Sequence, residues 1–168
     1  MSEALKGRCA LRYLDIRSTA IDGRSLAFAI KMNASLTYLD VRDSPRWDDA
    51  VFHVVGSALL EKGCHSNLSF ARCDAFDLLP GTTTLSLQER ALGIGVVHIL
   101  AALLSRNLEL RDLDLSATDI DQRGATAIAS ALQRNTSLTR LALQYNHMDD
   151  ESKLSIQAAA GATLNIII

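Results

Sequence analysis

A short hydrophobic pattern recurs along this chain. Apolar residues occupy the first, fourth and sixth positions of a segment that reads L-x-x-L-x-L, and mostly polar residues stand between them. Complete copies begin at Leu11, Leu36, Leu110 and Leu138, and a copy with a polar first residue begins at Thr82. The intervals from 82 to 110 and from 110 to 138 are both 28 residues. Recurrence at such a period is typical of stacked repeat architectures.

Most copies are followed by a second apolar pattern, which has the periodicity of a helix. In the unit that starts at Leu110, four apolar residues fall on one face of a helix with 3.6 residues per turn: Ala127, Ile128, Ala131 and Leu132. Asp121 and Asp149 precede such stretches and are suitable N-caps. The pattern therefore predicts a repeated unit of short strand, turn and helix.

One such unit cannot bury its apolar surface alone, so the units are expected to stack. Stacking buries the repeated leucines, and each buried leucine contributes about 1.5–3 kcal/mol. We expect five strands of one parallel sheet, with helices covering one side of it. The expected strands are residues 13–16, 38–41, 85–88, 112–115 and 140–143.

The repeat resembles the leucine-rich repeat of the ribonuclease-inhibitor type, whose unit reads LxxLxLxxNxIxxxGxxxLAxAL. The unit from Leu110 matches through LRDLDLSATDI, Gly124 and AIASAL, and the unit from Leu138 matches through LTRLALQYNHM, with Asn146 at the ladder position. The resemblance implies an α/β fold: a leucine-rich-repeat solenoid, or horseshoe, of about five repeats with an inner parallel sheet and outer helices. It says little of function, because binding residues vary freely on this fold.

We expect a single leucine-rich-repeat domain over residues 1–168. Its repeats should start near residues 11, 36, 82, 110 and 138, with a partial repeat at 164–168 and an irregular segment at 68–81. The ladder position, which is Asn in the repeat type, holds other residues in four units: Thr19, Ser44, Arg90 and Thr118. A hydroxyl can still hydrogen-bond the turn backbone, whereas Arg90 is unsuited to it, so we expect the ladder to fail there.

The segment LSFARCDAFDLLPG, residues 68–81, departs from the repeat. It begins like a strand but leaves only 14 residues before Thr82, whereas a leucine-rich unit needs about 20 residues to close. It is either a strand with a short return or a projecting loop, and Pro80-Gly81 is a turn signal. Its large apolar residues either tuck under the neighbouring unit or face a partner: Phe70, Phe76, Leu78 and Leu79. We expect tucking, because exposed apolar patches are usually small.

Composition and charge narrow the classes of function. Hydrophobic residues make up 48% and charged residues 21% of the chain, as in globular proteins. The net charge of −2 argues against nucleic-acid binding, and the apolar runs are too short for membrane insertion. Three cysteines, Cys9, Cys64 and Cys73, do not make a disulfide framework. Without a secretory signal, we expect an intracellular protein of the cytoplasm, with an organellar location left open.

No pattern indicates catalytic chemistry. Cys64, His65 and Cys73 lack the paired spacing of metal-binding arms, and no G-x-S-x-G elbow accompanies the serines. Gly93 and Gly95 fit the turn into a helix better than they fit a phosphate loop. We therefore expect no catalytic residue, no metal and no cofactor.

The outward positions of the first two strands form a candidate binding patch. The strands read RYLDIR and TYLDVR, and in-register parallel pairing would place like residues about 4.8 Å apart. The patch contains Tyr13, Asp15, Arg17, Tyr38, Asp40 and Arg42. It is either a duplication whose Asp and Arg side chains pair at modest gain, or a partner-binding surface, because Tyr and Arg are enriched at interface hot spots. On the second interpretation, Tyr38→Ala weakens binding and leaves the fold intact.

Two further groups are candidates for partner binding. The later strands carry polar residues on the same face: Asp112, Asp114, Arg140, Gln144 and Tyr145. The last strand contains Ile166, Ile167 and Ile168, which are strong strand formers without a nearby charge or proline. An uncovered edge of this kind invites strand addition, so we expect a partner subunit or further repeats to cover it.

The function indicated by these features is protein–protein interaction, as a scaffold or as a subunit of a larger assembly. The identity of the protein partner is not encoded in any motif. Relatives of this repeat type include the activator of the GTPase Ran, which offers an alternative function of another class. Such an activator commonly supplies an arginine to the GTPase, and Arg46 and Arg90 are the candidate loop arginines.

Overall fold

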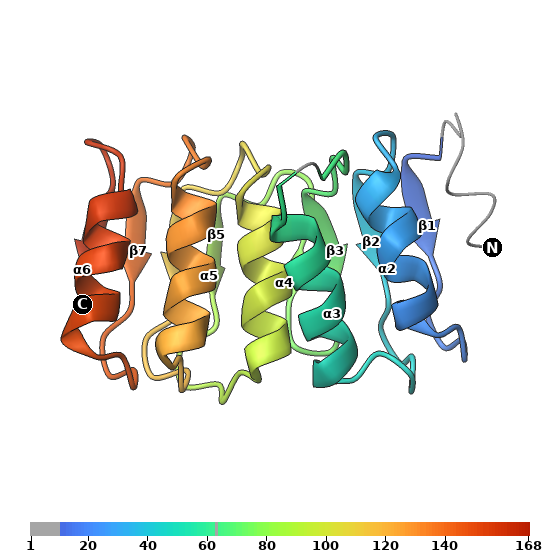
Figure 1. Ribbon diagram of the computed structural model, residues 1–168, viewed down its shortest axis with the longest axis horizontal. Helices are drawn as coiled ribbons and strands as arrows, with labels where there is room; N and C mark the ends of the chain where they lie inside the picture. The colour runs from blue at the N-terminus through green and yellow to red at the C-terminus, as the bar shows by residue number, and fades with distance from the viewer. Residues whose placement is uncertain (1–10, 63) are drawn as a thin grey trace.

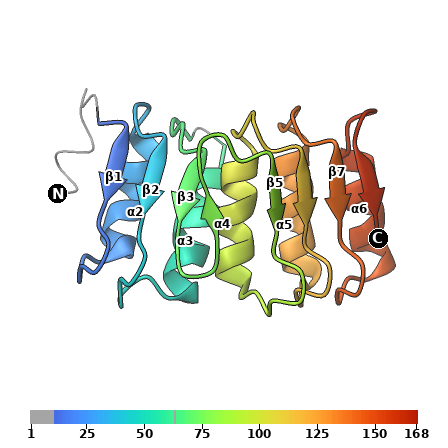
Figure 2. The ribbon, with the colours of Figure 1, turned by 180° about the vertical axis from the view of Figure 1, so that it is seen from behind.

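The computed structural model describes residues 11–62 and 64–168. A row of short strands is covered on one side by helices, which lie in front in Figure 1 and behind the strands in Figure 2. The elements are β1 (Tyr13–Asp15), α2 (Gly23–Met32), β2 (Tyr38–Asp40), α3 (Asp49–Leu60), β3 (Phe70–Arg72), β4 (Asp77–Leu78), β5 (Thr84–Ser86), α4 (Ile94–Leu104), β6 (Asp112–Asp114), α5 (Gln122–Leu132), β7 (Arg140–Ala142), α6 (Asp150–Ala159) and β8 (Asn165–Ile167). The described chain is therefore an α/β fold with five helices and largely parallel strands.

The described strands form two sheets rather than the one that we expected. Strands β1 to β4 make the first sheet and strands β5 to β8 make the second. All neighbours are parallel except β3 and β4, which are antiparallel. The expectation of one continuous parallel sheet is wrong, because a hairpin takes the place of a strand–helix return in the middle of the chain.

That hairpin is the irregular segment of the sequence. Leu68, Ala71 and Cys73 are buried at the three positions that leucines occupy in other units, and the chain then turns back as β4. Phe76 and Leu78 are buried, and Phe70 packs against the core as a half-buried residue. The segment is thus a strand with a short return, and its apolar residues are tucked.

The helical layer stays continuous where the sheet divides. No helix follows β3, so α3 and α4 pack directly against each other. Two glycines permit the close approach: a Cβ on Gly95 would lie 1.8 Å from the backbone oxygen of Asp49, and one on Gly56 would lie 2.6 Å from the backbone of His98. Helix α4 has no side-chain cap of its own, and Asp49 Oδ1 accepts a hydrogen bond from Val96 N at 3.1 Å instead.

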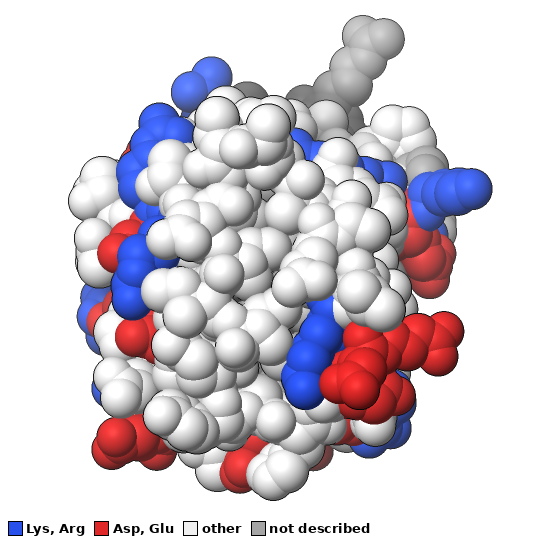
Figure 3. Space-filling view, turned by 90° about the vertical axis from the view of Figure 1, so that its left-hand side faces the viewer, with Lys and Arg blue, Asp and Glu red and all other residues white. Residues whose placement is uncertain are grey.

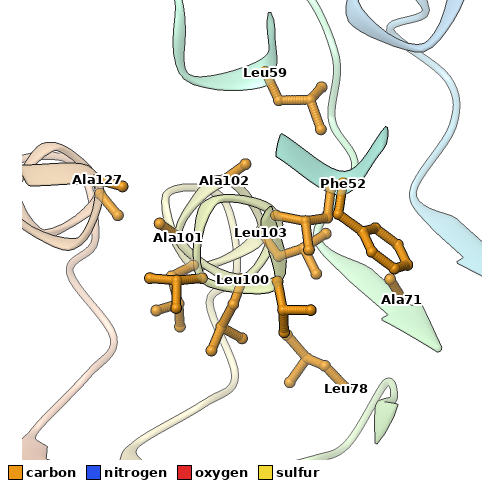
Figure 4. Packing of buried hydrophobic residues seen from close by; sticks show 14 of the residues in the cluster. Phe52, Leu59, Ala71, Leu78, Leu100, Ala101, Ala102, Leu103 and Ala127 are labelled. Carbon is orange, nitrogen blue, oxygen red and sulfur yellow. The ribbon is translucent and has the colours of Figure 1, made fainter. Parts of the chain in front are cut away.

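The core lies between the two layers and centres on α4. Leu100 and Leu103 of this helix are almost fully buried, together with Leu59 of α3 and Leu78 of β4. Figure 4 shows these side chains converging from the helices and from the hairpin. Nine of the residues of α4 are buried, because α3 and α5 contact it on either side.

The turns after the strands repeat with nearly the same geometry. The residue just before the ladder position has a positive φ of 53–61° in five units: Ser18, Asp43, Glu89, Ala117 and Tyr145. At the ladder position itself, Thr19, Ser44 and Thr118 donate their hydroxyls to backbone carbonyls just after β1 and β6 at 2.7–2.9 Å. Arg90 instead donates Nη1 to Ala75 O at 3.0 Å, so the ladder is broken there as expected.

Candidate functional site

Two tyrosines form the centre of a surface on the first sheet. Strands β1 and β2 pair in register, which places Tyr13 beside Tyr38. Their rings stack with centroids 4.3 Å apart and an interplanar angle of 6°. Tyr13 is 51% exposed and Tyr38 only 6%, because Tyr38 has Phe70 of β3 on its other side. Burial is the main cause that raises the pKa of Tyr38 to about 12.

Each of these strands also carries an internal Asp–Arg pair. Arg17 donates Nε and Nη2 to the Asp15 carboxylate at 3.0 and 2.8 Å. Arg42 donates the same two groups to Asp40 at 3.0 and 2.8 Å. Arg17 also lies 3.6 Å from Asp40, which links the two pairs across the strands. These contacts lower the pKa of Asp15 and raise that of Arg42, through the hydrogen bonds above all.

The third strand extends this surface with residues that sequence reasoning missed. Arg72 stands in register beside Asp40, and its guanidinium holds Asp77 of β4 through two hydrogen bonds of 2.8 Å. The missed signal is the spacing Leu68, Ala71, Cys73, which repeats Leu36, Leu39, Val41 with smaller apolar residues. We call the whole array the tyrosine–arginine surface; it consists of Tyr13, Asp15, Arg17, Tyr38, Asp40, Arg42, Phe70, Arg72 and Asp77.

Burial divides the tyrosine–arginine surface into contact and supporting residues. Asp40 is 1% exposed, and Tyr38 lies under Tyr13 and Phe70, so neither side chain offers much area to a partner. Direct contact with a partner through Tyr38 is therefore small, and the effect of Tyr38→Ala on binding and on the fold stays a prediction. Tyr13 and Arg17 present the exposed atoms, and Tyr38 and Asp40 hold them in place.

The second sheet carries a separate polar group. Arg140 donates Nη1 to Asp112 Oδ1 at 2.8 Å between adjacent strands. Asp114 accepts a hydrogen bond from the backbone of Ser116, which fixes the turn after β6. Tyr145 stands in the turn after β7 and is 85% exposed. The structure thus places these candidates on one sheet with each other, but on a different sheet from Tyr13.

The candidate isoleucines lie in and beside β8, at the end of the second sheet. Ile166 is in register with Leu141 and Ile167 with Ala142, and Ile166 and Ile168 pack against the core while remaining partly exposed. Among the described strands, β8 pairs with β7 alone. Figure 3 shows the adjoining end of the molecule as a broad area without charged side chains, with charges along its borders. Leu154 of α6 is exposed.

The groups considered for metal or catalytic chemistry do not come together. In residues 11–62 and 64–168, no three His, Cys, Asp or Glu side chains are grouped so as to hold a metal ion. Cys73 is buried, which raises the pKa of its thiol to about 11, and Cys64 is half-buried. Cys9 lies outside the described residues. Within those residues, no helix has both the length and the apolarity needed to cross a membrane.

Comparisons with known proteins agree with the repeat geometry. A family model described as "Leucine Rich repeat" matches residues 106–129 and 134–152, which contain β6, most of α5, β7 and the first turn of α6. No curated protein matches the chain. The tropomodulin C-terminal domain from Caenorhabditis elegans is similar at a TM-score of 0.44 and 12% identity, over 94% of this chain and 87% of that one. A structure titled leiomodin-1 actin-binding site 2 is similar at a TM-score of 0.36 and 15% identity, over 99% of this chain and 75% of that one.

Both TM-scores are below 0.5, so neither likeness indicates what this chain binds. The matched segments coincide with the two units in which the sequence keeps most of the repeat's leucines. The same strand, turn and helix recur in the units around β1, β2 and β5. Residues 106–129 and 134–152 therefore match the leucine-rich repeat, and the recurrence of the unit along the described chain is consistent with a protein of that type.

Proposed function

We propose that this chain is a protein–protein interaction module that binds a protein partner through the tyrosine–arginine surface. Its units form a leucine-rich-repeat solenoid of about five repeats within one domain, and the chain acts as a scaffold or as a subunit of an assembly. The observation that carries the proposal is the exposed Tyr13 ring, which is held flat on the buried Tyr38 ring. A large side chain that is already immobile loses little conformational entropy when a partner covers it.

The charges of the tyrosine–arginine surface support this assignment of roles. It contains three Asp and three Arg side chains, and each Arg is paired with one Asp. Because these charges cancel, long-range attraction contributes little, and the energy of binding must come from covering Tyr13 and from hydrogen bonds of the exposed guanidinium groups. We therefore expect the affinity for the partner to change little with ionic strength.

Affinity capture with matched variants tests the proposal. The tagged full chain is used to purify its partner from the cells that express it, and the dissociation constant is then measured with both purified proteins. Tyr13→Ala should weaken the affinity roughly 30-fold, equivalent to about 2 kcal/mol, because it removes the central aromatic contact. Arg17→Ala should weaken it by a smaller factor.

Phe28→Ala is the matched control, since Phe28 is an equally exposed aromatic residue on α2, in the helical layer. This control should keep the affinity of the unmodified chain. Equal affinities for the chain and its Tyr13→Ala variant, with folding unchanged by circular dichroism, would contradict the proposal. A loss in the Phe28→Ala variant alone would assign binding to the helical layer instead.

The alternative of a GTPase activator has less support. Arg90 donates a hydrogen bond to Ala75 O of the β3–β4 hairpin, so extending it toward a nucleotide would break that contact. Arg46 is exposed in the loop before α3, but the tyrosine–arginine surface does not include it. No described contact favours this activity.

A further inference from the structure

The division between the two sheets contains a cleft of about 420 Å³. Its floor includes the apolar residues Phe76, Leu85 and Leu87, and its rim carries charged residues from both sheets. This volume lies within the range of about 300–1,000 Å³ that is usual for ligand pockets. The cleft shares Arg42 and Asp77 with the tyrosine–arginine surface but does not include the Tyr13 ring, and the inference below does not rest on the function proposed above.

One wall of the cleft is the edge of β5. Leu87 donates its N–H to Asp114 O of β6 at 2.9 Å, and Thr83 O accepts hydrogen bonds from the backbone of β6. In a parallel ladder, alternate residues bond to opposite sides. The N–H and C=O groups of Thr84 and Ser86 therefore point away from β6 and toward the cleft, and among the described strands β5 has no other neighbour.

The opposite wall is the edge of β4. Cys73 donates its N–H to Phe76 O at 3.0 Å, which makes these two residues a hydrogen-bonded pair of the hairpin. In an antiparallel ladder the next pair is not hydrogen-bonded, so the N–H and C=O groups of Asp77 point away from β3. The cleft thus lies between two strand edges whose backbone groups face each other without being paired.

From this arrangement we infer that the cleft binds an extended segment of a partner protein, which adds as a strand between β4 and β5. Main-chain hydrogen bonds to Asp77 on one side and to Ser86 on the other would hold the segment, as in other cases of strand addition. Such a segment would join the two sheets into one.

The side chains around the cleft indicate which segment fits. Side chains of a strand alternate between its two faces, so every second residue of the segment points at the apolar floor and is aliphatic. The rim holds two Arg and two Asp, namely Arg42, Arg90, Asp74 and Asp77, so its net charge is zero. Charge therefore does not select the segment, and its outward residues are uncharged polar ones.

Hydrogen exchange in the free protein gives the first test. The amides of Ser86 and Asp77 should exchange fast, whereas the amide of Leu87, which is bonded to β6, should be protected. Equal protection of Ser86 and Leu87 in dilute protein would mean that the cleft is closed, and would overturn the inference. Protection of Ser86 that appears only as the protein concentration rises would identify a second copy as the occupant, and would overturn it as well.

Binding of peptides gives the second test. The probe is a phage-displayed library of linear heptapeptides, selected on the full chain. Selected peptides should alternate aliphatic and polar residues, and a synthetic copy should slow the exchange of the Ser86 and Asp77 amides at least tenfold. Failure to enrich any peptide, or enrichment of peptides that leave these amides unprotected, would contradict the inference.

Two variants that block the cleft complete the test. Ser86→Pro removes a donor that faces the cleft and no hydrogen bond to β6, and an edge strand tolerates such a proline. Cys73→Met adds volume beside the floor and serves if the proline variant does not fold. Each should weaken peptide binding at least tenfold, with Phe28→Ala on the exposed side of α2 as the control that leaves it unchanged. Equal binding by a folded blocked variant would overturn the inference.

Discussion

Tyr13 and Tyr38 show that the same residue type at equivalent positions takes different roles. Both occupy the residue before the second leucine of their repeats, and both point away from the helices. Tyr38 is covered because strands lie on both sides of it, with Tyr13 and Phe70 in register, whereas among the described residues Tyr13 has a strand neighbour on one side only. At the scale of the residue, the place of a strand in its sheet thus decides whether a side chain can contact a partner or supports one that does.

Asn146 is predicted to be the polar side chain on which the last turns depend most. Its Nδ2 donates to Leu115 O and Leu143 O at 2.7 and 2.9 Å, and its Oδ1 accepts from the backbone of Thr118 and Ile120 at 3.1 and 2.9 Å. Asn146→Ala should lower the free energy of unfolding by about 2 kcal/mol, because several backbone groups lose their partner. Urea denaturation measures the change.

The control for this change is Asn67→Ala. Asn67 is exposed and makes one described side-chain hydrogen bond, to Ala34 O at 2.7 Å. Asn67→Ala should lower the free energy of unfolding by less than half as much as Asn146→Ala does. Equal decreases in the two variants would show that the hydrogen bonds of Asn146 contribute no more to stability than a surface contact does.

His98 is predicted to make stability depend on pH. Burial between α3 and α4 lowers its pKa below 6.5, and the hydrogen bond to Ile94 O opposes this only partly. The neighbouring groups are His53, whose ring centroid is 4.5 Å away, and the charges of Asp121 and Arg123. The unfolded chain therefore binds a proton at His98 more readily than the folded chain does. The contribution of neutral His98 to the free energy of unfolding is complete above pH 6.5 and is lost as the pH falls through the folded-state pKa.

Urea denaturation at pH 8 and at pH 5.5 measures this dependence. The His98→Gln variant should lose less stability between these two values than the unmodified chain does. His65→Gln is the control, since it removes a histidine from the exposed surface. An identical loss in His98→Gln and in the unmodified chain would exclude His98 as the cause.

At the scale of the element, the β3–β4 hairpin determines how the two halves of the molecule meet. It removes one helix from the helical layer, so α3 and α4 must approach closely, and it leaves unpaired edges in the sheet layer. The tight helix contact and the cleft between the sheets are therefore two consequences of the same local departure from the repeat.

The closeness of α3 and α4 makes Gly95 difficult to replace. Alanine favours a helix by up to about 1 kcal/mol relative to glycine. A Cβ at this position would nevertheless lie 1.8 Å from Asp49 O, which forces the two helices apart. We expect Gly95→Ala to lower the free energy of unfolding by about 2 kcal/mol, as overpacking commonly does.

Thermal and urea denaturation of Gly95→Ala and Gly161→Ala check this expectation. A Cβ on Gly161 would meet no atom within 4 Å, so that variant should be nearly as stable as the unmodified chain. A Gly95→Ala variant as stable as the Gly161→Ala variant would show that the helix contact is looser than the structure has it.

At the scale of the whole molecule, the edge of β8 that faces no described strand is the feature most prone to self-association. Unpaired backbone groups lie there beside Ile166 and Ile168 and next to the uncharged end face (Figure 3). Open, apolar strand edges readily pair with other strands. We predict that this chain associates through β8 as its concentration rises from the micromolar to the millimolar range.

Sedimentation velocity over this range, with and without Ile167→Lys, tests the prediction. Ile167 is in register with Ala142 on the face away from the core leucines, so a lysine there adds charge to the edge without entering the core. The variant should remain monomeric. The prediction is wrong if the unmodified chain is monomeric over this range and its Ile166–Ile168 segment is ordered and exposed.

The amino-acid sequence by itself determined the repeated unit and its orientation. Leucines at the positions L-x-x-L-x-L define which side of each strand is buried, and the apolar face of a helix defines the covering layer, because both signals are local. The register of Tyr13 with Tyr38 and the failure of the ladder at Arg90 followed from the same spacing. The leucine-rich-repeat type could therefore be predicted from these positions alone.

Only the tertiary structure decided how the repeats join and which residues are accessible. Arg72 meets Asp77 because a hairpin folds back, and the spacing of leucines does not encode that return. The division into two sheets, the cleft between β4 and β5 and the burial of Tyr38 depend in the same way on which elements become neighbours. The physical reason is that local periodicity fixes the direction in which a side chain points, whereas exposure and unpaired edges depend on contacts between segments distant in the sequence.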